Sequence, residues 1–244
     1  LLQSSPSSYA ATIVDALVAF RENKAHSDLL CQIETTVRRV MGEVIRNVPV
    51  KVTASAVYGR AQEPLMLSSE RTEPECECCQ RCGGCSLWHM SYEEEKRFKL
   101  QKLNDALAHI GHQTLRAEEI IGSDCVTHYR NKGIYAVADT GGGIKSGFFA
   151  PRTHTLVPVE RCLIQKPLSD RVAAAVTEFM TANGIPAYDE QTGKGAVRHV
   201  YVRCAVNTED AVACIVSAKG FGSRTAALTG HLRSRCPELT GIVL

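Results

Sequence analysis

The feature that most constrains this chain is a dense run of cysteines at residues 76–89, CECCQRCGGCSLWH. Five of these fourteen residues are cysteine, and so short a segment cannot pair five thiols internally without strained disulfide geometry. Cysteines separated by two residues can converge on one metal centre, because a tight turn aims both sulfurs inward. The run therefore predicts a metal or cluster site.

Local spacing leaves two kinds of centre open. Four of the cysteines form C-x2-C-x2-C-x2-C, a spacing similar to the ligand run of bacterial ferredoxins: Cys76, Cys79, Cys82 and Cys85. The adjacent Gly83-Gly84 would let the backbone fold closely around a bulky cofactor. Zinc also binds cysteine, usually through two separated pairs rather than one dense run. Spacing thus favours an iron–sulfur cluster over zinc.

Composition bounds the class of protein. The chain has 244 residues, 44% of them hydrophobic, which is enough for a packed core. No run of 18 apolar residues and no signal-peptide pattern occurs in it, so we expect no membrane span and a cytoplasmic location. Residues 122–244 hold 14 Lys and Arg against 10 Asp and Glu. This balance is too mild to establish nucleic-acid binding by itself.

Periodicity divides the first half of the chain. Residues 9–47 have helical periodicity, and residues 48–70 change to strand alternation with turn residues between. A helix is predicted from Tyr92, with Ser91 as its N-cap, Glu94 completing a capping box and Gly111 ending it.

From residue 122 onward the pattern is rich in strands. Strands are expected at KGIYAVAD, IKSGFFA, THTLVPV, VRHVYVRCAV, DAVACIVSA and GIVL, with helices at LSDRVAAAVTEFMTA and SRTAALTGHLRSR. The sequence therefore predicts an α+β fold, in which helices pack on a mostly antiparallel sheet.

The longer string identifies a family. The pattern CxxxxxCGGCxxWH followed by SYEEEKRFKLQKL, together with HYRNKGIYAV, SGFFAPRTHTLVPVERCLIQ and VRHVYVRCAVNTEDAVACIVSA, resembles the RNA uracil-5-methyltransferases. Within that family the similarity is closest to the bacterial 23S ribosomal RNA enzymes that carry a [4Fe–4S] cluster. It runs from about residue 55 to residue 244.

The resemblance implies a different ligand set from local spacing. Cluster ligands in the family follow C-x5-C-x2-C with a remote fourth cysteine, and this pattern falls on Cys76, Cys82, Cys85 and Cys162. Cys78 and Cys79 would then be bystanders. The two interpretations differ in the fourth ligand, and the residues that flank Cys162 favour the family pattern.

The resemblance also implies a reaction and a division into domains. In the family, a cysteine adds to C6 of uracil, C5 takes a methyl group from S-adenosylmethionine, and a base removes the C5 proton. We expect the nucleophile, the base and the donor site beyond residue 244, so that this chain is an inactive fragment. The expected regions are 1–48, helical and of unclear origin; 49–75, the end of a TRAM-like β-barrel; 76–90 with 122–244, the cluster and RNA-binding domain; and 91–121, a helix that packs on the absent catalytic domain.

RNA contacts and partners follow from the same comparison. Two basic motifs of the central domain match Arg130 with Lys132, and Arg198 with His199. The resemblance implies 23S rRNA as the substrate and a monomeric protein. Two alternatives stay open: a tRNA rather than an rRNA substrate, and an iron–sulfur module that binds RNA without catalysis.

Overall fold

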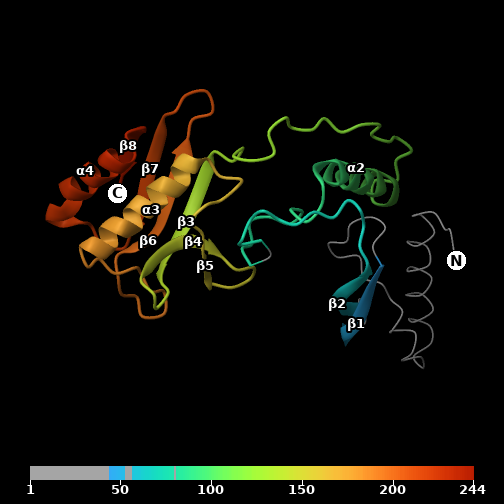
Figure 1. The fold of residues 1–244 in the computed structure, drawn as a ribbon, viewed down its shortest axis with the longest axis horizontal. Helices are drawn as coiled ribbons and strands as arrows, with labels where there is room; N and C mark the ends of the chain where they lie inside the picture. Colours follow the sequence, from blue (N-terminus) through green and yellow to red (C-terminus); the bar gives the residue numbers. More distant parts are fainter. Residues whose placement is uncertain (1–43, 53–56, 80) are drawn as a thin grey trace. The chain divides into compact units, whose positions relative to one another are not determined.

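The structure, a computed structural model, describes residues 44–52, 57–79 and 81–244, with side chains described from residue 67 onward. The chain divides into two compact units. In the described residues, the first unit contains β1, β2 and α2, and the second contains the cysteine loop, residues 74–88, and residues 121–244 (Figure 1).

The first unit begins with a two-stranded antiparallel sheet. Strand β1, Val44–Val52, pairs with β2, Val57–Met66, in the region where strand alternation was predicted. The helix expected through residue 47 is wrong at its end, because β1 already begins at Val44. The rest of that expected helical segment, residues 1–43, lies outside the described residues. The TRAM-like assignment of residues 49–75 stays a prediction.

Helix α2, Tyr92–His109, begins at the predicted cap. The Ser91 hydroxyl accepts a hydrogen bond from the Glu94 amide at 3.2 Å, which satisfies one of the unpaired donors of the first turn. The Ser91 amide donates to the Glu70 carbonyl at 2.8 Å, so the second half of the predicted capping box is replaced by a contact with the preceding segment. The Gly111 amide donates to the Ala106 carbonyl at 2.9 Å, and the helix ends there as expected.

The second unit is built on a six-stranded sheet in the order β5-β4-β3-β6-β7-β8. Its strands are β3 (Lys132–Asp139), β4 (Ile144–Phe149), β5 (Leu156–Pro158), β6 (Val197–Cys204), β7 (Ala211–Ser217) and β8 (Leu239–Val243). Neighbours are antiparallel except β7 and β8, which are parallel. A parallel pair needs a crossover, and the short turn η2 (Gly222–Arg224) with helix α4 (Thr225–Arg235) lies between these two strands. The predicted α+β class with a mostly antiparallel sheet is confirmed.

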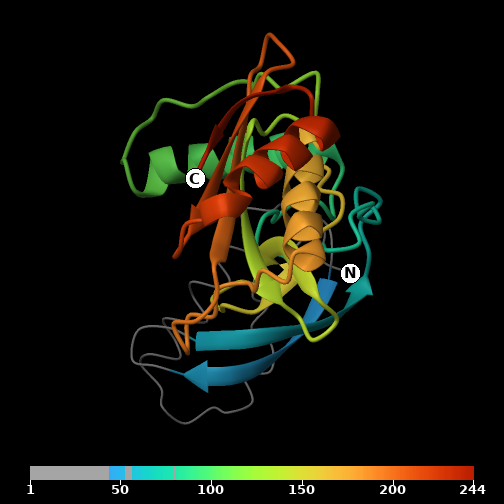
Figure 2. The ribbon, with the colours of Figure 1, turned by 90° about the vertical axis from the view of Figure 1, so that its left-hand side faces the viewer.

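Helices α3 (Pro167–Ala182) and α4 cover one face of this sheet (Figures 1 and 2). Alternate residues of β6, such as Val200 and Val202, are fully buried, because successive strand side chains point to opposite faces. They pack with Val176 and Met180 of α3 in one core cluster. In the described part of the chain, no helix is long and apolar enough to cross a membrane.

Candidate functional site: a cysteine-lined pocket

The cysteine loop, residues 74–88, is made of turns rather than helix or strand. The Cys79 amide donates to the Cys76 carbonyl at 2.9 Å, and the Cys82 amide donates to the Cys78 carbonyl at 2.9 Å. The Gly83 amide donates to the Phe149 carbonyl at 3.4 Å, which joins the loop to the end of β4. Tight turns therefore gather the thiols at the edge of the sheet.

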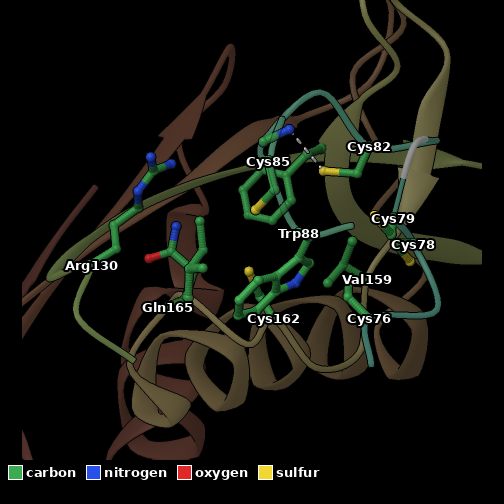
Figure 3. Close-up of a pocket in the computed structure, with 13 residues that line it drawn as sticks. Cys76, Cys78, Cys79, Cys82, Cys85, Trp88, Arg130, Val159, Cys162 and Gln165 are labelled. Carbon is green, nitrogen blue, oxygen red and sulfur yellow. Dashed lines mark hydrogen bonds between the residues drawn. The ribbon is translucent and has the colours of Figure 1, made fainter. Parts of the chain in front are cut away.

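Six cysteines line one pocket of this unit: Cys76, Cys78, Cys79, Cys82, Cys85 and Cys162 (Figure 3). Trp88 also lines the pocket, together with Phe148 and Val159. The loop thus faces Cys162, which lies 77 residues after Cys85 in the sequence.

A buried polar chain fixes the position of Cys162. Its amide donates to Oδ2 of Asp170 at 2.9 Å, and Oδ1 of Asp170 accepts a hydrogen bond from the Tyr135 hydroxyl at 2.7 Å. Asp170 lies in the first turn of α3, and Tyr135 is fully buried in β3. Sequence reasoning missed this pair, because it joins a helix and a strand that local pattern does not connect.

The thiols of the pocket affect one another electrostatically. Burial, together with the neighbouring Cys162, Cys82 and Cys76, raises the pKa of the Cys85 thiol to about 11, while Arg130 acts in the opposite direction. Burial also raises the pKa of Cys162, which the backbone amides of Ile164 and Gln165 oppose. Amides directed at a sulfur favour its thiolate form, the form that binds metals.

Cys78 has a different environment from these four. Its thiol donates to the Pro158 carbonyl at 3.4 Å, and Nη2 of Arg81 lies 3.9 Å from its sulfur. In Figure 3, Cys78 and Cys79 lie together at one end of the pocket, whereas Cys85 and Cys162 lie in its middle. Cys78 is therefore already engaged with the backbone at the end of β5.

The donor set suits a thiophilic centre in its chemistry. Soft thiolate ligands select zinc, copper(I) or iron–sulfur clusters, and the Gly84 amide donates to the Cys82 sulfur at 3.4 Å. Among the described residues, no group of three or more His, Cys, Asp or Glu side chains is already arranged to hold a metal ion. The pocket has a volume of about 40 Å³, and the side chains that line it would have to rearrange to hold a cluster.

The four predicted RNA contacts fall into two separate pairs. Arg130 lines the cysteine pocket, and Lys132 opens β3 next to it. His199 pairs with Ala136 of β3. Ala136 lies four residues after Lys132, so His199 is roughly 13 Å from Lys132 along the strand direction. Arg198 and His199 line a different cavity, so the structure does not bring the two basic motifs together.

Comparison with known proteins shows extended similarity. An uncharacterized RNA methyltransferase of Caldanaerobacter subterraneus is 37% identical over 194 residues, which cover 80% of this chain and 43% of that protein. An uncharacterized RNA methyltransferase of Clostridium tetani is 33% identical over 178 residues, 73% of this chain and 39% of that protein. This chain therefore spans less than half the length of these curated relatives.

A solved structure has the same fold. The Pyrococcus abyssi tRNA (uracil-54, C5)-methyltransferase, determined with S-adenosyl-L-homocysteine, matches with a TM-score of 0.58 at 22% identity, covering 80% of this chain and 43% of that one. A search of protein-family models found no match. The sequence relatives show that this chain belongs to a family of RNA methyltransferases, and the solved structure shows a shared fold.

Proposed function

We propose that this chain is the part of an S-adenosylmethionine-dependent RNA (uracil-5-)-methyltransferase that holds a [4Fe–4S] cluster and contributes to RNA recognition. The observation that carries the proposal is the six-cysteine pocket in a chain whose relatives are named RNA methyltransferases.

The ligands we propose are Cys76, Cys82, Cys85 and Cys162. The position of all four around one pocket supports the set, as does the hydrogen bond that occupies Cys78. A bound cluster would supply a covalent link between the cysteine loop and the segment before α3. The residues of the chain orient that link: Asp170 holds the Cys162 backbone, and the Gly84 amide contacts the Cys82 sulfur.

We propose that Arg130 connects the cluster site with RNA recognition. Its side chain lines the cysteine pocket yet is exposed, and its amide donates to the Ile164 carbonyl at 2.9 Å. This hydrogen bond ties the backbone of Arg130 to Ile164, which lies two residues after Cys162. A cluster bound to Cys162 would therefore also restrain Arg130. An arginine held in this way can offer two hydrogen bonds to a phosphate or stack on an unpaired base.

Metal analysis of the anaerobically purified chain tests the cluster. We expect about four irons per chain, and broad absorption near ~400 nm, as cubane clusters show. Stoichiometric zinc without iron, even after anaerobic reconstitution, would contradict the proposed [4Fe–4S] cluster.

The reaction is tested with the complete gene product that contains these residues. Labelled S-adenosylmethionine is offered together with 23S rRNA or with tRNA, and the product is digested to nucleosides. We expect label in 5-methyluridine from 23S rRNA. Label in 5-methyluridine from tRNA alone would show that tRNA, and not 23S rRNA, is the substrate. Label in neither RNA would refute the activity.

A further inference from the structure

The second unit contains another cavity, of about 320 Å³, where β3 ends and β6 begins. We call it the loop pocket and define it by six of its lining residues: Phe149, His154, Tyr188, Glu190, Arg198 and His199. Its volume is at the lower end of the range for small-molecule sites. It is therefore large enough for one small planar group, but not for a helical stem of RNA.

The backbone holds one wall of the loop pocket in place. The segment between α3 and β6 folds into a loop with bridges between Ala187 and Val197 and between Asp189 and Lys194. Gly195 has φ +103°, and a Cβ atom there would lie 2.0 Å from the Ala187 carbonyl oxygen. Only glycine fits this close approach, so the loop that presents Tyr188 and Glu190 is set by the chain itself.

A β-bulge adds two more residues to the lining. The register between β6 and β7 shifts between Val197 and His199, which leaves Arg198 as the extra residue. In a regular strand, consecutive side chains point to opposite faces, whereas a bulge redirects one of them. Arg198 and His199 can therefore line the same cavity.

Planar groups converge on this cavity from three segments. The Phe149 ring lies 5.4 Å from the His154 ring and 6.4 Å from the His199 ring, edge-on to the latter. The Arg198 guanidinium lies over the Tyr188 ring at 4.9 Å. Unstacked RNA bases are held on aromatic rings and arginine planes of this kind.

The charges of the loop pocket disfavour a phosphate. Its lining includes three carboxylates, on Asp139, Asp189 and Glu190, against the single guanidinium of Arg198. Burial lowers the pKa of His199, and Arg198 lowers it further while Glu190 opposes this, so its ring is uncharged at neutral pH. An uncharged planar ligand suits this lining better than an anion.

Glu190 supplies the acceptors that would select the ligand. One carboxylate oxygen accepts from Nη2 of Arg198 at 2.9 Å, and the other lies 3.2 Å from Nδ1 of His154. A carboxylate can accept about four hydrogen bonds, so acceptor capacity remains. Guanine offers two adjacent N–H donors to a carboxylate, as well as the O6 and N7 acceptors that arginine recognises.

We propose that the loop pocket binds a single unstacked guanine of the RNA, at a position other than the uridine that is methylated. This inference rests on the proposed function, since it presupposes an RNA substrate. It specifies the RNA contact expected of Arg198 and His199 as recognition of a base.

Binding of the 244-residue chain to labelled 12-nucleotide single strands tests the proposal by fluorescence anisotropy. The strands are all uridine or carry one central guanine, adenine or cytosine. We expect the guanine strand to bind about tenfold more tightly than the other three, the size of one stacked and hydrogen-bonded base. Glu190→Gln should abolish this preference, and Phe149→Leu should weaken guanine binding about tenfold while the all-uridine strand changes little.

Glu178→Gln is the matched control, because Glu178 also pairs with an arginine and a histidine, Arg235 at 3.0 Å and His231 at 3.7 Å. It lies on α3, outside the loop pocket, and should keep the preference. If Phe149→Leu fails to fold, as judged by circular dichroism, Tyr188→Leu replaces it. Equal binding of all four strands by the unmodified chain would overturn the inference and leave the proposed function standing, whereas no binding of any strand would contradict both.

Discussion

The cysteine pocket and the loop pocket belong to the same unit but are held together in different ways. The loop pocket is fixed by backbone geometry: a positive-φ glycine at Gly195, bridges within the loop and a bulge at Arg198. The cysteine loop has turns and a few hydrogen bonds to the sheet, and its converging groups are thiols that burial keeps protonated. The chain thus builds the loop pocket by itself, whereas we propose that a metal centre completes the cysteine pocket.

The strongest test of this comparison is the fourth ligand. Cys162→Ser replaces a thiolate with a hard, weaker oxygen ligand, and we expect the iron to be lost. Because the cluster would cross-link distant segments, its loss should cost ~2–4 kcal/mol of stability in the iron-loaded protein, by analogy with a disulfide. Iron analysis and thermal melts measure both effects.

Cys79→Ser is the matched variant for that experiment. We expect it to keep its iron and its melting temperature within error. If Cys79→Ser loses iron while Cys162→Ser retains it, the ferredoxin-like spacing is correct and the ligand set proposed here is wrong.

The second test concerns the loop pocket. Gly195→Ala forces a Cβ against the Ala187 carbonyl at a φ that L residues rarely adopt, and we expect a loss of ~1–3 kcal/mol. Gly220→Ala is the control, since a Cβ there would meet nothing within 4 Å. Denaturant melts give the stability, and the iron content of both variants should equal that of the unmodified chain. Loss of iron from Gly195→Ala would show that the two sites are not independent.

A third, smaller effect is expected at the support of the cysteine pocket. Tyr135→Phe keeps the buried ring but removes the hydrogen bond to Asp170, leaving a buried carboxylate oxygen without that donor at a cost of ~1–2 kcal/mol. We expect faster iron release to a chelator and an unchanged guanine preference. Unaltered release would mean that Asp170 does not hold Cys162 in place.

The smallest effect is expected at Lys132. Its exposed side chain is proposed to contact one phosphate, so Lys132→Ala should weaken RNA binding only a few-fold and lower the slope of log affinity against log salt by ~0.7 for a single strand. Anisotropy titrations between low and moderate salt measure this slope. If this variant lost the guanine preference, Lys132 would take part in base recognition, and the two basic motifs would not have separate roles.

The sequence by itself determined the elements of the second unit. The strand KGIYAVAD is β3 without change, because its apolar run contains Ile, Tyr and Val, which favour strands, and three consecutive glycines, residues 141–143, follow it closely. The helix predicted at LSDRVAAAVTEFMTA is α3, which begins one residue earlier, at Pro167, because proline suits the first helical position and lacks only an amide that would be unpaired there. Such signals are local, so they can be read without knowing what the element packs against.

Tertiary structure alone decided which distant residues meet. Spacing within the cysteine loop pointed to Cys79, and nothing in the local pattern indicates that Cys162 faces the same pocket. The hydrogen bond between Tyr135 and Asp170, the parallel pairing of β8 with β7 and the extra residue at Arg198 are likewise absent from periodicity. Each depends on the register and packing of elements far apart in the sequence, and one residue of register is enough to turn a side chain to the other face of a sheet.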